Sequence, residues 1–216
     1  MLIDINKQHE SLKENLYLIK TLLPDLYKSI KNTGDLVKEL GKTLEIKEPE
    51  FELAGYYANI GLITIVNIFS NDGKLTDSDF ENVKAHPKNG QDFLLQKGLV
   101  NAAEYVYLHH EKPGGKGYYK ETSSITKESL LIGIADVFMG CVTPKPYKET
   151  MEIEKAINII REEYFITTLL TEKEKEKIVD TLLSFYKSIK IILMDKTEEE
   201  ELQEINNLKN EFNELI

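Results

Sequence analysis

The sequence has one cysteine, no tryptophan and only four histidines in 216 residues. A single cysteine, Cys141, cannot form an internal disulfide, so the fold must rest on its apolar core and we expect a reducing compartment. Its apolar and small neighbours are typical of a buried thiol and not of a reactive one. No apolar run approaches the length of a membrane span or of a signal peptide's hydrophobic region, so we expect a cytoplasmic protein that does not enter the membrane.

Positive charge is also in the minority. The chain carries 27 Lys and Arg residues against 37 Asp and Glu residues, which gives a net charge of −10. Such a surface repels nucleic acid polymers and anionic membranes, so an anionic ligand must bind at a local basic pocket. The length allows one domain, or one domain with helical extensions, and is sufficient for a sizeable core.

Alternation of the kind that marks β-strands is absent, whereas apolar residues recur at helical spacing along most of the chain. The sequence therefore predicts an all-α fold. Near the N-terminus, an apolar stripe over residues 7–30 predicts a helix that Pro24 kinks or divides. Its apolar face fits either packing on the rest of the domain or the seam of a homodimer. Residues 32–35 (Asn-Thr-Gly-Asp) predict a break before a helix that begins at Leu36.

The remaining predicted helices share amphipathic or wholly apolar patterns. They are expected at 51–60, 77–86, 87–97, 99–111, 130–139, 149–161, 171–194 and from 202 onward, with a turn at 71–74. Three threonines, Thr76, Thr126 and Thr171, are expected to cap the helices that follow them.

Three of the four histidines lie in the second quarter and middle of the chain, and two of them are adjacent. His109-His110-Glu111 ends an apolar run, and three glycines follow within six residues, so metal-binding residue types run into a loop with unusual backbone freedom. Histidines at the end of a helix also bond its last carbonyl groups, so the triplet alone does not distinguish a site from a helix end. Asp136, in the middle of a strongly apolar helix, is a second position that requires an explanation.

Six short motifs follow one another along the chain: Leu75-Thr76, His86-Pro87 with Gly90, His109-His110-Glu111, Gly115 with Gly117-Tyr118, Ala135-Asp136-Val137, and Lys145-Pro146-Tyr147-Lys148. In order and spacing they resemble the HD-GYP family, the bacterial branch of the HD metal-dependent phosphohydrolases that degrade cyclic di-GMP. The resemblance implies an HD-domain-like helical bundle with a core at 49–161. Residues 1–48 are then N-terminal helices packing on this core, and 162–216 are a C-terminal helical extension.

By this resemblance, His86, His109, His110 and Asp136 occupy metal-ligand positions. Three imidazoles and a carboxylate would suit one divalent ion, Fe, Mn, Zn or Ni, provided that they converge. The alternative is a hydrogen-bonded polar cluster without a metal, in which Asp136 holds a histidine tautomer or a buried lysine. His9, far from the other three histidines in the sequence, is expected at the surface.

The resemblance also implies residues that bind the organic ligand. Tyr118, Lys145 and Lys148 stand where the family binds cyclic di-GMP, so this or a related nucleotide is the expected ligand, and the loop Gly115–Tyr119 is expected to contact signalling proteins. Lys145 lies between two prolines on a stiff loop, which favours a phosphate contact, although lysines on such loops are also common as plain solvated residues.

The chain departs from the family where the naming His-Asp pair is expected, because it reads Ala58-Asn59-Ile60-Gly61-Leu62. In the family the aspartate bridges two metal ions and neutralises their repulsion, which the neutral amide of Asn59 cannot do. Ala58 offers no ligand atom, and Leu62 replaces a lysine that contacts phosphate. No histidine between His9 and His86 is present to supply the family's upstream ligand.

These departures lead to three interpretations. The first is a catalytically degenerate HD-GYP-like domain that acts as a regulatory or protein-interaction module, with cyclic dinucleotide binding retained or lost. The second is a divergent metal-dependent phosphohydrolase or cyclic di-GMP phosphodiesterase with a reduced metal site. The third is a dimeric helical scaffold. Whether any catalysis remains is left open by the sequence.

Overall fold

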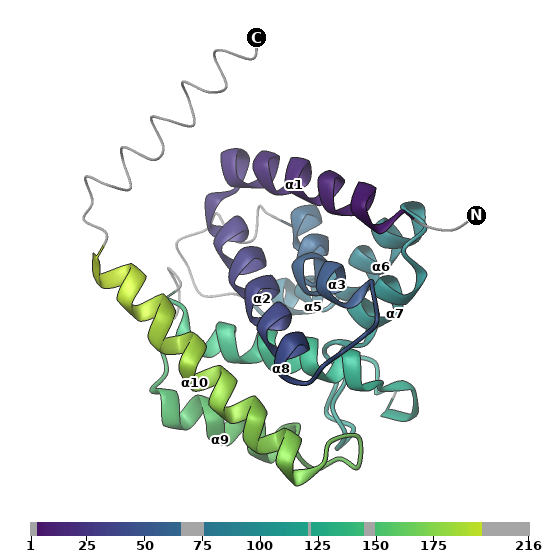
Figure 1. The fold of residues 1–216 in the computed structure, drawn as a ribbon. Coiled ribbons are helices and arrows are strands. Elements are labelled where there is room, and N and C mark those ends of the chain that lie inside the picture. The colour runs from purple at the N-terminus through teal and green to yellow at the C-terminus, as the bar shows by residue number, and fades with distance from the viewer. Residues whose placement is uncertain (1–3, 66–75, 121, 145–149, 196–216) are drawn as a thin grey trace. The chain divides into compact units, whose positions relative to one another are not determined.

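The computed structural model describes residues 4–65, 76–120, 122–144 and 150–195, which contain helices and no β-strand (Figure 1). The all-α prediction is therefore confirmed. The chain divides into two compact units, Met1–Leu182 and Leu183–Ile216, and the first contains every site residue discussed below. The turn predicted at 71–74 and the helix predicted from 202 lie outside the described residues.

The described elements, with η marking 3-10 helices, are α1 (Ile5–Leu22), α2 (Pro24–Thr43), α3 (Phe51–Tyr57), η1 (Ile60–Ile65), α5 (Asp77–Val83), α6 (His86–Gln96), α7 (Val100–Leu108), η2 (Thr122–Ser124), α8 (Lys127–Val142), α9 (Ile153–Glu163) and α10 (Glu172–Asp195).

Pro24 separates α1 from α2, as predicted, because a proline opens a helix readily but cannot continue one. The break predicted at residues 32–35 is wrong, since α2 passes through them without interruption. Gly34 is there for packing: a Cβ atom at this position would lie 2.1 Å from Cδ1 of Tyr56 on α3. Tyr56 also donates a hydrogen bond from its hydroxyl to Asp35, at 2.5 Å. The glycine thus lets α2 and α3 approach closely.

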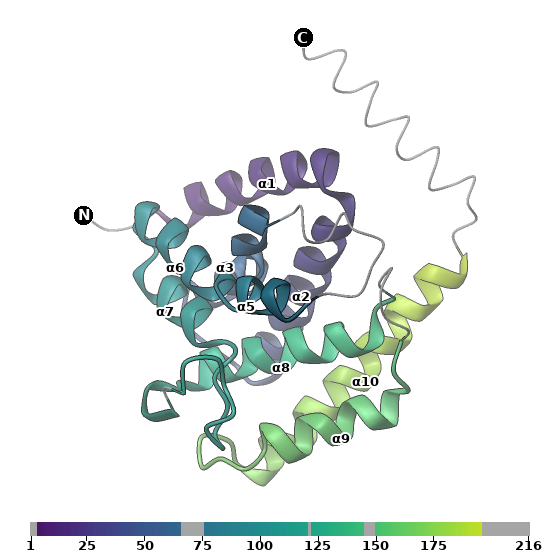
Figure 2. The same cartoon turned by 180° about the vertical axis from the view of Figure 1, so that it is seen from behind.

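The core is organised around α2, α3 and α8. Helix α2 contacts α1, α3 and α8, while α8 also contacts α7 and α9, and the view from behind shows α8 between the α2–α3 pair and α9 (Figure 2). Helix α8 is buried on nearly all sides, which explains its continuous apolar sequence from Leu130 to Ala135. Asp136 follows directly and is an acidic side chain among these apolar residues.

The predicted threonine caps are confirmed for α5 and α8. Thr76 with Asp79, and Thr126 with Ser129, form reciprocal capping boxes in which each side chain bonds the other residue's backbone N–H. Thr171 accepts a hydrogen bond from the backbone N–H of Glu174 at the start of α10. These caps fix where the helices begin.

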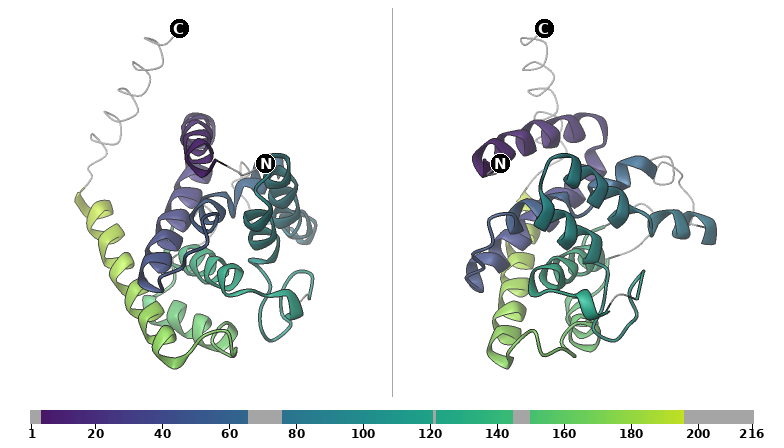
Figure 3. Two further views of the ribbon diagram at one scale, coloured as in Figure 1. Left: turned by 45° about the vertical axis from the view of Figure 1, so that its right-hand side comes forward. Right: turned by 90° about the vertical axis from the view of Figure 1, so that its right-hand side faces the viewer.

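Three helices each end three residues earlier than predicted. Helix α3 stops at Tyr57 instead of residue 60, so Asn59 follows the helix. Helix α5 stops at Val83, and its last turn tightens into a bond from the Ala85 N–H to the Asn82 carbonyl, at 3.1 Å. His86 consequently begins α6, with Pro87 in its first turn. Helix α7 ends at Leu108, so His109 and His110 follow the helix instead of lying within it. Helix α6 packs on α7, and α7 packs on α8 (Figure 3).

Two glycines allow close backbone contacts at two of the histidines. A Cβ atom on Gly61 would lie 2.1 Å from the backbone oxygen of His86, and one on Gly133 would lie 2.2 Å from the backbone oxygen of His109. Real Cβ atoms do not approach a carbonyl oxygen so closely, and backbone cannot move aside as a flexible side chain can. Each glycine therefore sets the position of one histidine.

We expect Gly133→Ala to lower the free energy of unfolding by about 1–3 kcal/mol, because the added methyl group forces α8 away from the end of α7. Gly140→Ala is a matched control on the same helix, since nothing lies within 4 Å of its Cβ position. The control should gain up to about 1 kcal/mol from better helix propensity. Urea unfolding followed by circular dichroism measures both, and equal effects of the two changes would contradict the close-approach argument.

Candidate metal centre

Three histidines from two helix ends converge in the interior. His86 begins α6, while His109 and His110 follow α7, and one ligand atom from each lies within 4.8 Å of the others. The residue His86 is 2 % exposed and His109 is 0 % exposed, and the side chain of His110 is 12 % exposed. Ligand positions that are 23 residues apart in the sequence are therefore adjacent in the fold.

Backbone carbonyls fix the tautomers of two of these rings. The Nδ1 atom of His86 lies 2.7 Å from the Val83 oxygen, and that of His109 lies 2.5 Å from the Val106 oxygen. Because a carbonyl oxygen only accepts, each Nδ1 must donate, and each neutral ring keeps its lone pair on Nε2. Proteins orient metal-binding histidines in this way, with one ring nitrogen donating to a carbonyl oxygen and the other free to bind the metal.

The two Nε2 atoms face each other at 3.3 Å. Two lone pairs at this distance repel unless a proton or a metal cation lies between them. Protonation is disfavoured, because burial lowers the pKa of His86 to about 4 and also lowers the pKa of His109. Burial, then the neighbouring imidazoles, lower the pKa of His110 well below its ordinary value. Neutral imidazoles are the form that binds metals.

The distances fit a single ion. Two histidine nitrogens bound to one tetrahedral zinc, each at about 2.0–2.1 Å, lie about 3.3 Å apart, which is the separation of the His86 and His109 Nε2 atoms. Two histidine nitrogens at the upper limit of 4.8 Å would need a side-chain shift on the order of 1 Å before both could bind the same ion. The cluster could therefore bind a divalent metal with small adjustment.

Asp136 lies next to the cluster, but one of its carboxylate oxygens is hydrogen-bonded to another residue, Asn59. Its Oδ2 atom lies 3.7 Å from Nε2 of His110, while its Oδ1 atom accepts a short hydrogen bond from the amide of Asn59. Asn59 follows α3 and is 4 % exposed. If residue 59 were an aspartate, its carboxylate would face the carboxylate of Asp136, and the two would repel each other unless cations lay between them. The amide instead satisfies Asp136 without any cation.

The other two positions of the altered motif hold no polar group. Ala58 ends α3 and is fully buried, and Leu62 lies on η1, partly buried. Neither residue has a ligand atom or a charge to offer the histidine cluster.

Tyr118 covers one side of the histidine cluster. Its ring stacks on that of His110, with centroids 4.4 Å apart, and meets the ring of His86 edge-on at 6.4 Å. Burial, and then the charge of Asp136, raise the pKa of Tyr118 to about 12, so its hydroxyl remains a proton donor. The structure thus brings Tyr118 together with the histidines. Lys145 and Lys148 lie outside the described residues, and their phosphate contact stays a prediction.

Glu111 is not part of the cluster, although it follows His110 directly. It is 1 % exposed and accepts a hydrogen bond from the backbone N–H of Tyr119, at 2.8 Å. Tyr119 in turn stacks on Tyr107 and donates its hydroxyl to the backbone oxygen of Lys84, at 2.8 Å. These contacts anchor the glycine-rich loop, so the role of Glu111 is to hold this loop in place. His9 lies on α1, partly exposed and outside the cluster.

One residue beside the site had no signal in the sequence. Tyr164 ends α9, is fully buried, and is one of two residues in the described chain with a buried side-chain polar atom that lacks a hydrogen-bond partner. Lys112 lies over its ring, 5.7 Å from the centroid, and bonds Glu163 at 2.6 Å. A tyrosine at the end of an amphipathic helix cannot be distinguished from a core residue by sequence pattern alone.

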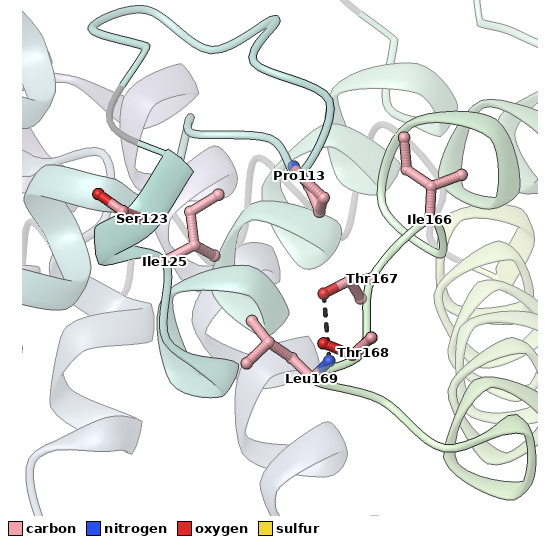
Figure 4. Close-up of a pocket in the computed structure, with 7 residues that line it drawn as sticks. All are labelled: Pro113, Ser123, Ile125, Ile166, Thr167, Thr168 and Leu169. Atoms are coloured by element: carbon pink, nitrogen blue, oxygen red, sulfur yellow. Dashed lines mark hydrogen bonds between the residues drawn. The ribbon is translucent and has the colours of Figure 1, made fainter.

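A hollow of about 370 Å³ lies between the loops that follow α7 and α9 (Figure 4). Its lining includes the hydroxyls of Ser123, Thr167 and Thr168, and the Leu169 N–H bonds the Thr167 hydroxyl at 3.2 Å. The lining has no acid, base or metal-ligand side chain, so it offers no chemistry comparable to that of the histidine cluster.

Residues 12–164 match the HD domain family. This range covers more than half of the chain and contains all three clustered histidines, Asn59 and Asp136. The chain therefore belongs to the HD domain family.

The curated relatives include three phosphodiesterases. The 3′3′-cGAMP-specific phosphodiesterase 1 of Vibrio cholerae is 32 % identical over 133 residues, which cover 59 % of this chain and 30 % of the relative. A cyclic di-GMP phosphodiesterase of Pseudomonas aeruginosa is 30 % identical over 138 residues, with 59 % and 33 % coverage. One of Thermotoga maritima is 31 % identical over 134 residues, with 59 % and 36 % coverage.

The chain spans about a third of the length of these relatives. Their names agree with the resemblance to the HD-GYP family, and the family match extends beyond the core expected at 49–161 to include α2 and most of α1.

Among the described helices, none combines the length and the apolar character needed to cross a membrane.

We expect Asn59→Asp to lower the free energy of unfolding by roughly 2–3 kcal/mol in the presence of a chelator, because it replaces a buried hydrogen bond by two facing carboxylates. Added Mn²⁺ should restore much of this loss, since a cation can bridge the two groups. Thermal unfolding with and without metal measures both effects. Asn158→Asp adds the same charge at an exposed position on α9, so it should change neither the stability under chelation nor the response to Mn²⁺. An Asn59→Asp protein as stable as the parent under chelation would contradict this account of the pair.

Proposed function

We propose that the protein is an HD domain with a reduced, single-ion metal centre, which binds a cyclic dinucleotide and acts as a regulatory module and not as an efficient phosphodiesterase. The observation that carries this proposal is the pair of facing Nε2 atoms of His86 and His109 at 3.3 Å, in a buried cluster whose imidazoles are held neutral. A buried polar cluster without a cation would leave these lone pairs in repulsion.

His86, His109 and His110 would hold the ion, with Fe, Mn, Zn or Ni as the candidates that suit imidazole ligands. When bound, the ion supplies positive charge and Lewis acidity next to Asp136. The ligand class follows from the relatives, whose names specify cyclic di-GMP and 3′3′-cGAMP. Tyr118 offers a protonated hydroxyl beside the cluster, and Lys145 and Lys148 offer positive charge on a chain whose net charge is −10.

The reduction of the site follows from Asn59. Two adjacent cations require a bridging carboxylate between them, and the amide offers neither the charge nor a second oxygen. Its hydrogen bond to Asp136 also occupies one oxygen of the nearest carboxylate. With Ala58 and Leu62 beside it, three polar groups that the family resemblance implies are replaced within five residues.

A divergent phosphodiesterase is the second candidate, favoured by the named activities of the relatives. One metal ion can lower the pKa of a bound water to about 7, so a single-ion site is compatible with slow hydrolysis. The two candidates differ in turnover and not in the ligand that they bind.

We expect elemental analysis of the purified protein to find about one transition-metal ion per chain. His109→Ala should lose it, because His109 supplies one of the two facing nitrogens, whereas His9→Ala removes a histidine outside the cluster and should retain it. A metal-free parent protein, or equal loss in both variants, would contradict the metal centre.

The same samples should bind cyclic di-GMP or 3′3′-cGAMP in a filter or calorimetric assay and hydrolyse them at most slowly. Turnover at rates of about 1 per second or more would identify the protein as a phosphodiesterase and reject the regulatory proposal. Absence of binding with the metal present would reject the ligand class.

A further inference from the structure

The hydroxyl of Tyr164 is a buried polar group with no hydrogen-bond partner among the described residues. Such groups are rare in folded proteins, because burial without a partner removes the hydrogen bonds that water would supply. The ring does not need the hydroxyl for its own packing, since it lies fully buried at the end of α9 and Lys112 covers its face. A phenylalanine would fill the same space without the cost.

The ring of Tyr164 lies against α8 beside the backbone of His109, which carries one of the clustered imidazoles. A Cβ atom on Gly133 would lie 3.2 Å from Cε1 of Tyr164 and 2.2 Å from the backbone oxygen of His109. Both groups therefore lie against the same point of α8, and Cε1 is the ring carbon next to the one that carries the hydroxyl. Asp136 follows Gly133 by three residues, which is nearly one helical turn, so its side chain lies on the same face of α8.

Burial and the surrounding charges keep the hydroxyl of Tyr164 protonated. Burial, and then the charge of Asp136, raise the pKa of Tyr164 well above 10, and Tyr118 contributes in the same direction. The group is therefore a donor that needs an acceptor. Asp136 influences it through its charge but is not its hydrogen-bond partner.

The acceptor must reach the hydroxyl from the cluster. Tyr164 is fully covered, whereas the side chains of His110 and Asp136 are 12 % and 17 % exposed, so the cluster is the side that is open to solvent. The approach also passes Tyr118, which stacks on His110. A group entering here meets the imidazole of His110, the carboxylate of Asp136 and the ring of Tyr118.

We propose that the Tyr164 hydroxyl donates a hydrogen bond to a phosphate oxygen of the ligand bound at the histidine cluster, and so serves as a ligand-binding residue. This inference rests on the proposed function, because it requires a cation at the cluster to attract the phosphate. An oxygen of a phosphodiester is a strong acceptor and carries no proton at neutral pH that would compete with the tyrosine donor.

The test compares Tyr164→Phe with Tyr105→Phe, both in the full chain loaded with Mn²⁺ and titrated with inorganic phosphate by calorimetry. Tyr105 on α7 is a matched control, since the charges acting on its hydroxyl come from Glu128, Glu48, Glu104 and Glu50 and not from Asp136. Tyr164→Phe should weaken phosphate binding roughly tenfold or more, while Tyr105→Phe leaves it unchanged. Mn²⁺ affinity should be the same in both variants.

A second readout separates binding from structure. Without phosphate, Tyr164→Phe should be at least as stable to heat as the parent protein, because it removes an unpartnered buried hydroxyl. A clear loss of melting temperature, or phosphate affinity equal to that of the parent, would overturn the assignment of Tyr164. A parent protein that binds neither Mn²⁺ nor phosphate would overturn the proposed function together with this inference, whereas intact binding in Tyr164→Phe overturns the inference alone.

Discussion

The site depends on two imidazole nitrogens that face each other in the protein interior. The Nε2 atoms of His86 and His109 are 3.3 Å apart, and the carbonyl groups of Val83 and Val106 fix both rings in the tautomer that points their lone pairs inward. Burial opposes protonation, so a bound cation is the remaining means of relieving the repulsion. The close contacts of Gly61 with His86 and of Gly133 with His109 show that helix packing maintains this arrangement.

Under the proposed function, the charges around the histidines suit one ion better than two. Three neutral imidazoles and the carboxylate of Asp136 carry one negative charge, and Asn59 adds none while it bonds Asp136. One divalent cation would leave the site with a net positive charge, which favours an anionic ligand. A second cation would add repulsion that no neighbouring carboxylate offsets, because Glu111 faces the glycine-rich loop instead.

Several parts of this structure follow from local rules. The helical periodicity, the division at Pro24 and the capping boxes at Thr76 and Thr126 depend on residues within one or two turns of each other, so the sequence predicts them well. The ordered motifs likewise predict the family and the group of histidines. Gly34 misled the prediction because glycine marks both a helix break and a close helix contact, and only its neighbour Tyr56, 22 positions away, distinguishes the two.

The sequence by itself determined the all-α class and the family, and it shows an amide, Asn59, where the family resemblance implies an aspartate. The tertiary structure alone decided that Asn59 donates to Asp136, 77 residues away, that Glu111 anchors a loop, and that the hydroxyl of Tyr164 is buried without a hydrogen-bond partner among the described residues. The physical reason is that residue type and spacing report local backbone preferences. Which side chains finally meet depends on how α3, α7, α8 and α9 pack, and that packing is set by long-range contacts that no local pattern contains.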